Sequence, residues 1–415
     1  MRDTDLYATI LGVRPPWSVS NVDLRRQDED VYVIVRWRAD EPVSCPECRK
    51  QMPGYDTVER TWRHLDTCQY RTFLVAHVPR VNCAEHGVLT VHVPWAEPKS
   101  GFTALFEAVV IDWLMEASIS AVARQLRLTW DQVSGIQARA VERGLARRSI
   151  RDVTLIGVDE TSFQKRHEYV TSVVDLERSI VLHIADGRGK DALDSFYTEL
   201  SPDQRGKIQA VAMDMWDGYV KSTEANVPGA ENKIAFDRFH VARHLNEAVN
   251  TVRKHEHREL ISKGDKRLLR TKYQWLKNPA DLDSSLKDGF GELRSSNLKT
   301  ARAWAIKETA RDLWNYATRA WAERAWKKWL AWACRSRLEP IQRAAVTIRK
   351  RLRGIINAVV LNVTNATTES LNSKIQWIKR TACGYRNRQR FRNAIYFHCG
   401  GLDLYPAALS THSTS

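Results

Sequence analysis

The chain has 415 residues, which is more than one small domain needs, so two to four domains are expected. Its 64 lysines and arginines outnumber 49 acidic residues and give a formal net charge of +15, which favours a polyanionic partner such as nucleic acid, with a membrane surface as the rival. No run approaches the roughly 18 to 20 apolar residues of a membrane span, and residues 1–5 lack a secretory pattern, so we expect a cytoplasmic protein.

Residues 1–98 are predicted to form a small β module. Apolar and polar residues alternate in short runs at 31–35, 72–75 and 88–93, and proline and glycine separate these runs. Such alternation is typical of strands joined by turns.

A zinc site is predicted inside this β module. Four residues have the spacing of two metal-binding turns, one C-x2-C and one C-x2-H: Cys45, Cys48, Cys83 and His86. Side chains of the protein would fill all four positions of a tetrahedral Zn²⁺, so the ion would be structural. The fourth ligand stays open, because His64, Cys68 and His77 are also available. The alternative is that these are unrelated turn residues of a reduced protein.

Residues 99–150 have a helical period and are predicted to hold three helices that include a DNA-binding helix-turn-helix. The period of the first helix is read from the apolar residues Leu105, Val109 and Trp113. Thr129 can cap the last helix, and Arg127 stands where glycine is common, so a longer or strained turn is expected.

The two helices of this motif are expected to pack through Ala123, Leu128 and Val133. Four residues are predicted to face DNA: Arg124, Trp130, Gln132 and Gln137. The alternative is an ordinary helical hairpin that supports a neighbouring element.

Residues 151–255 return to strand patterns and are predicted to form the first part of a catalytic core. Asp159 follows the apolar run 155–158, and Asp214 follows 210–213 in the same way, with a β-hairpin predicted between them. This matches a ribonuclease-H-like arrangement, in which adjacent strands direct carboxylates at shared metal ions. The alternative is that each aspartate only begins a loop.

Phosphodiester cleavage is suited to such a pair, because two divalent ions about 4 Å apart activate the attacking oxygen and neutralise the leaving one. We therefore predict two Mg²⁺ or Mn²⁺ ions per site, with Glu369 as the third carboxylate. Leu371, Ile375 and Ile378 form an apolar stripe at helical spacing, and Glu369 falls on the opposite polar side. A solvated helix face is the alternative.

Further polar residues have predicted supporting roles. Auxiliary positions near the metal ions are assigned to three residues: Asp237, His240 and Asn372. Contacts with the cut strand are assigned to three cations that follow Glu369: Lys374, Lys379 and Arg380. For these cations a solvated basic face is the alternative.

Residues 256–352 are predicted to form a basic, tryptophan-rich helical insertion between two parts of the core. The segment 251–355 carries 26 lysines and arginines against 11 acidic residues, a surplus equal to the +15 of the whole chain. It also contains seven tryptophans: Trp275, Trp304, Trp314, Trp321, Trp326, Trp329 and Trp332. The cations can neutralise phosphates and the indoles can stack on bases, although helical spacing also allows inward packing. Residues 353–405 would complete the core, and 406–415 would form a flexible tail.

Several of these motifs, in this order, resemble the ISL3 family of bacterial insertion-sequence transposases. They are residues 156–160, 169–171, 213–216, 237–241 and 365–380, followed by 384–387. The resemblance covers almost the whole chain, with the zinc knuckle and the helix-turn-helix included. Two residues depart from the family pattern: Ser370 replaces a common glycine, and His86 replaces the second cysteine of a pair.

This resemblance implies a ribonuclease-H-like catalytic domain whose Asp, Asp and Glu are Asp159, Asp214 and Glu369, with an insertion in the 155 residues between the last two. It also implies a nucleoid-associated enzyme that binds terminal inverted repeats, cuts them, and joins their 3′-hydroxyls to target DNA as a dimer or larger oligomer. The expected architecture is a multidomain α+β and α/β protein with a zinc module, a helix-turn-helix and an interrupted core. The alternatives are a metal-dependent nuclease or resolvase that does not join strands, and an inert DNA-binding regulator.

Overall fold

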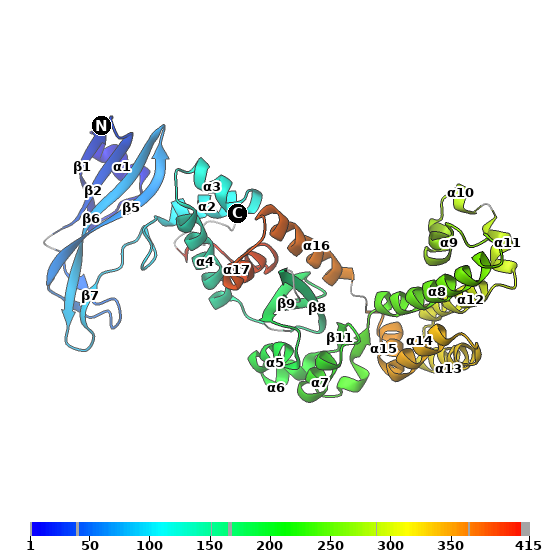
Figure 1. Cartoon of the computed structure of the whole chain (residues 1–415). Helices are drawn as coiled ribbons and strands as arrows, with labels where there is room; N and C mark the ends of the chain where they lie inside the picture. Colours follow the sequence, from blue (N-terminus) through cyan, green and yellow to red (C-terminus); the bar gives the residue numbers. More distant parts are fainter. Residues whose placement is uncertain are drawn as a thin grey trace. The chain divides into compact units, whose positions relative to one another are not determined.

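In the computed structural model, the described residues are 2–38, 41–150, 152–164, 168–287, 289–363 and 366–407 (Figure 1). They form two compact units. The first contains residues up to Arg148 together with those from Tyr396 onward, and the second contains Ser149–Ile395. Asn365 and residues 408–415, which belong to the predicted catalytic helix segment and tail, lie outside the described residues.

The first unit begins with a five-stranded sheet of order β1-β2-β6-β5, with β7 paired to β6. Its elements are α1 Asp3–Ile10, β1 Trp17–Arg25, β2 Asp30–Trp37, β5 Asp56–Thr67, β6 Tyr70–Cys83 and β7 Gly87–Thr90. β2 and β6 are parallel, and the other pairs are antiparallel. Alternate residues of β2 (Val31, Val33 and Val35) pack with Trp17 and Trp62, which confirms the period-two pattern read there. The predicted third run ends early, at Thr90.

Three helices follow the sheet: α2 Ala104–Glu116, α3 Ile119–Gln125 and α4 Trp130–Arg147. The predicted first helix is confirmed as α2, but two of the apolar residues that indicated it face solvent, since Leu105 is 41% and Trp113 is 43% exposed. Phe106, Val110 and Leu114 are buried instead. The helix is apolar on both faces, so periodicity alone could not select the side that packs against α4.

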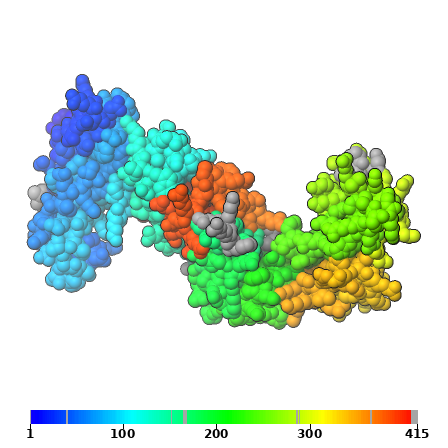
Figure 2. All heavy atoms as spheres, viewed as in Figure 1, coloured from blue at the N-terminus to red at the C-terminus, as the bar shows by residue number. Residues whose placement is uncertain are grey.

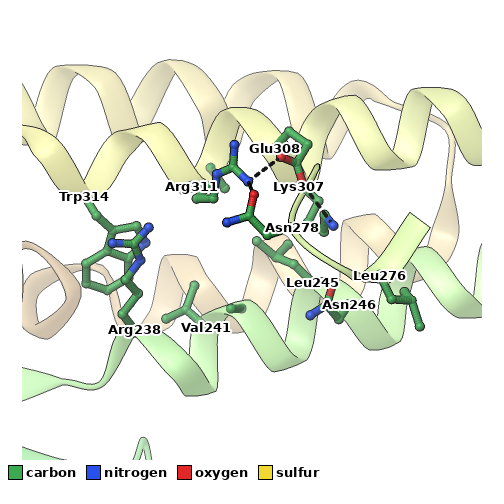
Figure 3. A pocket seen from close by; sticks show the side chains of 12 residues that line it. Arg238, Val241, Leu245, Asn246, Leu276, Asn278, Lys307, Glu308, Arg311 and Trp314 are labelled. Carbon is green, nitrogen blue, oxygen red and sulfur yellow. Dashed lines mark hydrogen bonds and ion pairs between the residues drawn. The ribbon is translucent and has the colours of Figure 1, made fainter. Parts of the chain in front are cut away.

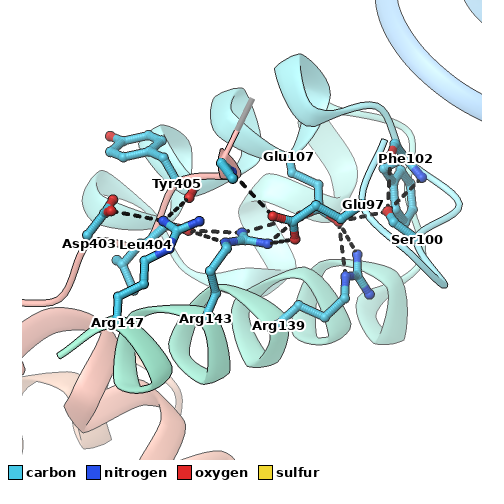
Figure 4. A network of polar contacts seen from close by, with 11 residues as sticks. Glu97, Ser100, Phe102, Glu107, Arg139, Arg143, Arg147, Asp403, Leu404 and Tyr405 are labelled. Atoms are coloured by element: carbon cyan, nitrogen blue, oxygen red, sulfur yellow. Dashed lines mark hydrogen bonds and ion pairs between the residues drawn. The ribbon is translucent and has the colours of Figure 1, made fainter. Parts of the chain in front are cut away.

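The buried carboxylate of Glu107 organises these helices with the end of the chain (Figure 4). Glu107 is 1% exposed, and its Oε1 accepts hydrogen bonds from Arg139 and from Ser100. Arg143 reaches both Glu107 and Glu97 and donates to the Leu404 carbonyl at 2.9 Å. Because an unpaired buried charge is costly, these ion pairs fix α4 against α2 and the segment around Leu404.

The second unit is built on a sheet of order β10-β9-β8-β11-β12. Its strands are β8 Leu155–Gln164, β9 Glu168–Asp175, β10 Ile180–Asp186, β11 Ala210–Met213 and β12 Ile234–Phe236. The first three form an antiparallel meander, and β11 runs parallel to both β8 and β12. Three helices accompany the sheet: α5 Lys190–Glu199, α6 Pro202–Lys207 and α7 Asp217–Asn226.

A helical segment follows β12 and forms one continuous body, coloured from green through yellow to orange in Figure 2. Its longer helices are α8 Arg238–Ile261, α12 Lys299–Asp312, α13 Arg319–Arg335, α14 Glu339–Lys350 and α15 Leu352–Leu361. Short turns between α8 and α13 are α9 Lys272–Leu276, η2 Pro279–Asp281, α10 Ser284–Lys287, α11 Phe290–Ser295 and η3 Leu313–Asn315. Pro340 lies in the first turn of α14, where its missing N–H costs nothing.

Tryptophans fill much of the helical core. Trp275, Trp326 and Trp329 are almost fully buried, and Trp329 Nε1 donates to the Ile306 carbonyl at 2.8 Å. Trp321 and Trp332, in contrast, are exposed. The inward packing that helical spacing allows therefore holds for some of these side chains and not for these two.

The last helices are α16 Ala366–Thr381 and α17 Arg388–Cys399. Leu371, Ile375 and Ile378 are buried, which confirms the apolar stripe read for α16. No helix of the described residues combines the length and apolar character needed to cross a membrane.

Candidate catalytic and DNA-binding sites

Three adjacent parallel strands each carry an aspartate at the same level of the sheet. Val158 of β8, Met213 of β11 and Phe236 of β12 lie side by side in the sheet. The next residue of each strand is Asp159, Asp214 and Asp237 in turn. Since neighbouring strands are about 4.8 Å apart, the sheet brings these three acidic positions to one level. The expected strand end at Asp159 was wrong, because β8 continues to Gln164.

Asp159 lies in a partly closed environment. Burial raises its pKa to about 6, although the backbone N–H of Glu160, which donates to Oδ1 at 2.7 Å, acts in the opposite direction. In the described part of the chain, neither Asp159 nor Asp214 has a lysine or arginine partner. A desolvated carboxylate without a cation favours binding of an external one.

Asp214 is close to an imidazole on the first turn of α8. His240 Nδ1 is 3.1 Å from Asp214 Oδ1, but the arrangement lacks hydrogen-bond geometry, so this buried nitrogen has no hydrogen-bond partner. Asp237 caps α8 by accepting from Phe239 N at 3.1 Å, while its buried Oδ2 also has no partner. Buried polar atoms are normally satisfied, so the unpartnered Asp237 Oδ2 beside the two aspartates fits a site for a hard cation, which prefers oxygen ligands.

Glu369 is not gathered with the two aspartates. It is exposed in the first turn of α16. Among the described residues, Asp159, Asp214 and Glu369 do not form a group whose ligand atoms lie within 4.8 Å of one another. The residue that α16 does bring to Asp159 lies one turn further on.

That residue is Asn372, which links α16 to β8. Its amide nitrogen donates to Asp159 Oδ2, and its carbonyl oxygen accepts from Thr161 Oγ1 at 2.6 Å. Thr161 therefore fixes the orientation of the amide, so its NH₂ group points at the carboxylate. Sequence reasoning gave Asn372 an auxiliary position but did not identify Thr161.

The cations of α16 are placed differently from one another. Lys379 Nζ donates to the Ser162 carbonyl at 2.8 Å, so this ammonium fastens α16 to β8 and is not free for a DNA strand as predicted. Lys374 and Arg380 are exposed. The contacts of Lys374 and Arg380 with DNA stay a prediction, whereas the bond of Lys379 explains why position on a basic helix did not predict its role.

Arg188 is a site residue that the sequence reasoning missed. Its guanidinium lies 5.1 Å from the Tyr169 ring and 4.6 Å from the Trp216 ring, and it pairs with Glu160 at 3.5 Å. Glu160 directly follows Asp159 in sequence, and Trp216 closely follows Asp214. Arg188 therefore lies beside the two aspartates. A usable signal was its position between Gly187 and Gly189, just after a strand, where loops often carry functional side chains.

The helix-turn-helix is formed by α3 and α4. Thr129 Oγ1 accepts from Gln132 N at 3.2 Å, and Gln132 Oε1 accepts from Thr129 N at 2.8 Å, so the predicted cap is a reciprocal capping box. Arg127 has φ +55°, a left-handed conformation that explains the unusual turn without glycine. Ala123 and Val133 are buried as predicted.

The predicted DNA-facing residues of this motif separate into two groups. Arg124, Trp130 and Gln132 are exposed. Gln137 is only 5% exposed and was wrongly assigned to a groove, because it lies on the same side of α4 as Val133 and Ile136. A glutamine can be polar and still belong to a helical core.

The four predicted zinc ligands lie together at two turns. β3 Val43–Ser44 and β4 Gln51–Met52 form a small hairpin around Cys45 and Cys48, while the β6–β7 turn carries Cys83 and His86. The four ligand atoms lie within 4.8 Å of one another.

Their spacing suits zinc. Cys48 Sγ is 3.8 Å from Cys83 Sγ, and His86 Nδ1 is 3.9 Å from Cys45 Sγ and 3.5 Å from Cys83 Sγ. Ligand bonds of about 2.3 Å in a tetrahedron place sulfur atoms roughly 3.8 Å apart. The backbone N–H of Glu85, followed by His86, lowers the pKa of Cys83 to about 6, which favours the metal-binding thiolate.

The alternative fourth ligands lie outside this group. His64 Nδ1 is 2.9 Å from Thr103 Oγ1, His77 is 3.6 Å from Glu59, and Cys68 is exposed. None of the three belongs to the four-residue group found among the described residues. The Cys₃His group supports a structural zinc ion.

A cavity of about 170 Å³ lies between α8, α12 and the turn after α9 (Figure 3). Arg311 donates to Asn278 Oδ1 at 2.6 Å and pairs with Glu308 at 2.9 Å, and Lys307 pairs with the same carboxylate at 3.0 Å. Arg238 lies 5.9 Å from the Trp314 ring. Glu308 therefore forms ion pairs with two of the cations that line this cavity and partly offsets their charge.

Family comparisons agree with this domain content. A model of the zinc-finger of transposases IS204/IS1001/IS1096/IS1165 matches residues 41–86, and one of the helix-turn-helix domain of transposase family ISL3 matches 91–141. A third family model, described as transposase, matches residues 156–395. Together these models cover the zinc group, the capped helix pair and the sheet with its aspartates.

The chain is also similar to two transposases over most of its length. It is 27% identical over 421 residues to a transposase for insertion sequence element IS1557 from Mycobacterium tuberculosis, with 94% of each chain covered. It is 28% identical over 359 residues to a transposase for IS1001 from Bordetella parapertussis, covering 84% of this chain and 86% of the relative. Because the transposase model alone spans more than half of the residues, the chain belongs to the ISL3 family of insertion-sequence transposases.

Proposed function

We propose that the chain cuts the ends of its own insertion sequence and joins their 3′-hydroxyls to target DNA at a single site built on Asp159, Asp214 and Glu369. One observation carries this proposal: Asp159 and Asp214 lie at the same level of two neighbouring parallel strands. Neither has a lysine or arginine partner among the described residues. The hairpin of β9 and β10 and the parallel pair β8 and β11 support a ribonuclease-H-like core.

Asp159 and Asp214 would hold the metal ions, and Glu369 would be the third ligand. When bound there, a pair of Mg²⁺ or Mn²⁺ ions supplies charge stabilisation to both the attacking and the leaving oxygen of an in-line displacement. Glu369 rests on the family resemblance and on its position one turn before Asn372, since residues three apart share a helix face.

The surrounding residues would keep the carboxylates oriented. Asn372 holds Asp159 through its amide, and Thr161 prevents that amide from turning over. His240, whose Nδ1 lies 3.1 Å from Asp214 Oδ1, would help to position the second carboxylate. Arg188, Lys374 and Arg380 would neutralise phosphates of the strand that enters the site.

DNA recognition is proposed for the first unit and strand holding for the helical segment. The zinc module, with limits 1–98, and the helix-turn-helix, 99–150, would read the inverted repeats through the exposed Arg124, Trp130 and Gln132. The insertion would span 256–352 between core parts at 151–255 and 353–405. Two ends must be joined in one event, so a dimer or larger assembly on DNA is proposed.

A strand-transfer assay tests this function. Labelled duplexes carrying the element's ends are mixed with the full chain, a supercoiled target plasmid and Mg²⁺. We expect label covalently attached to the plasmid after protein digestion. Label released without joining would identify a nuclease, and binding without any cleavage would identify a DNA-binding regulator.

A further inference from the structure

Helix α13 presents two large aromatic side chains to solvent. Trp321 is 58% exposed and Trp332 is 41% exposed, whereas Trp326 and Trp329 of the same helix are buried. Indoles are usually covered in a helical core, and two exposed on one helix indicate a surface that contacts another molecule.

The two indoles border a hollow of about 410 Å³ that α13 forms with η3 and the end of α12. Tyr316 lies at its rim and Trp329 contributes to its floor. Arg324 and Lys328 line it between the two exposed tryptophans. One side of this helix therefore places two cations between two exposed aromatic rings.

The charge of this hollow is uncompensated. The Arg324 guanidinium lies 4.9 Å from the Trp321 ring, and no acidic residue lines the hollow. Neither Arg324 nor Lys328 forms an ion pair with any described residue. In the cavity of Figure 3, in contrast, Glu308 forms ion pairs with both Lys307 and Arg311.

We propose that this face of α13 binds the unpaired bases of a single DNA strand. Trp321, Trp332 and Tyr316 provide planes on which bases stack, and Arg324 and Lys328 neutralise the phosphates between them. A duplex would use only the cations, since its bases are already stacked on one another. A single strand can contact both kinds of group, because its bases stack on the exposed rings and its phosphates pair with the cations.

A second copy of the chain fits this face less well. In a symmetric dimer the same patch meets itself, so two cations of one copy would approach the same two cations of the other without a carboxylate between them. A DNA strand brings the opposite charge.

The length of the face suits a short stretch of strand. Trp321 and Trp332 are eleven residues apart in one helix, which corresponds to about 16 Å, and a stacked strand advances about 3.4 Å per phosphate. The proposal rests on the function proposed above, because cutting and joining of ends is what exposes unpaired strand to the enzyme. It names the place outside the carboxylate site where that strand is held.

Binding of a fluorescein-labelled dT15 oligonucleotide to the full chain tests the proposal, measured by anisotropy in buffer without added Mg²⁺ or Mn²⁺ and without a chelator, so that the structural zinc is retained. An abasic 15-mer with the same phosphates and a 15-base-pair duplex serve as comparison probes. We expect W321A/W332A to weaken dT15 binding at least tenfold and to change binding of the other two probes less than twofold. R324A/K328A should weaken both single-stranded probes.

Tyr273→Ala is the matched control, because Tyr273 is 57% exposed and also lies beside a cation, Lys272, but outside the hollow. It should bind dT15 as the wild type does. W321F/W332F keeps aromatic planes and should retain most of the affinity, which separates loss of stacking from loss of folding.

Unchanged dT15 binding by W321A/W332A would overturn the proposal, and so would an equal loss for dT15 and the abasic probe. A change from dimer to monomer with dT15 binding intact would show that the face joins two copies. Cleavage plays no part in this measurement. A negative result in the dT15 binding test therefore does not contradict end joining. A negative result in the strand-transfer assay likewise does not contradict binding of dT15 to α13.

Discussion

At the scale of single residues, Asn372 is the side chain on which the geometry of Asp159 depends. Its amide nitrogen, on α16, donates a hydrogen bond to Asp159 Oδ2. Thr161 donates to the other end of the amide and so fixes which end faces the carboxylate. Groups that orient a metal ligand often change metal affinity almost as strongly as the ligands themselves.

Replacing Asn372 by alanine should therefore raise the Mg²⁺ concentration that gives half-maximal cleavage by about 10- to 100-fold. Ser373→Ala, at the exposed neighbouring position of the same helix, is the control and should leave the Mg²⁺ titration unchanged. Equal Mg²⁺ titrations for both variants would remove Asn372 from this role.

His64 gives the first unit a defined dependence on pH. Burial, followed by the nearby charge of Arg63, lowers its pKa to about 4, whereas an unfolded histidine has a pKa of about 6.5. The folded unit therefore keeps His64 neutral while the unfolded chain takes up a proton. The stability is fully present above about pH 6.5 and falls as the pH is lowered towards 4, by at most a few kcal/mol.

This effect can be measured by hydrogen exchange of β5 and β6 amides in the full chain between pH 7 and pH 4. After correction for intrinsic exchange rates, protection should decrease more steeply in the wild type than in His64→Asn. Parallel pH profiles for the two proteins would show that other groups control acid stability.

At the scale of elements, the zinc module depends on two turns that lie far apart in sequence. The small β3–β4 hairpin has few ladder bonds of its own, so a metal ion shared with the β6–β7 turn would hold it to the sheet.

We expect one equivalent of zinc per chain by elemental analysis, lost on Cys83→Ser and reduced on His86→Ala. Cys68→Ser is the matched control and should retain the metal, since Cys68 lies outside the four-residue group. Zinc loss in the Cys68 variant, with retention in the His86 variant, would reassign the fourth ligand.

Element by element, the sequence predicted most of what depends on local pattern. The strands that lead to Asp159 and Asp214, the Thr129 cap and the buried stripe of α16 follow from alternation, capping chemistry and helical period. These signals act over a few residues, so one sequence contains them.

What failed depends on packing between distant segments. The face of α2 that is buried and the interior position of Gln137 are set by contacts with other helices. The bond of Lys379 to Ser162 and the position of Arg188 beside Tyr169 and Trp216 join residues far apart in the chain. Periodicity contains no record of such partners.

At the scale of the whole molecule, the excess positive charge and the candidate catalytic carboxylates lie in different segments of the chain. Residues 251–355 of the helical segment carry a positive surplus equal to that of the entire chain, while the carboxylates lie at one level of the sheet of the second unit. This division suits a polyanion such as DNA, which must be bound along its length and cut at one position.

The central claim is that Asp159 and Asp214 form the cutting site, and cleavage of end DNA by Asp159→Asn and Asp214→Asn tests it most directly. Asp186→Asn is the control, because Asp186 also ends a strand of this sheet but pairs with Arg388 and Arg392. We predict a loss of more than about a hundredfold in Mg²⁺-dependent cleavage for the first two variants, with end binding and melting temperature retained. Cleavage at the wild-type rate by either variant would contradict the assignment.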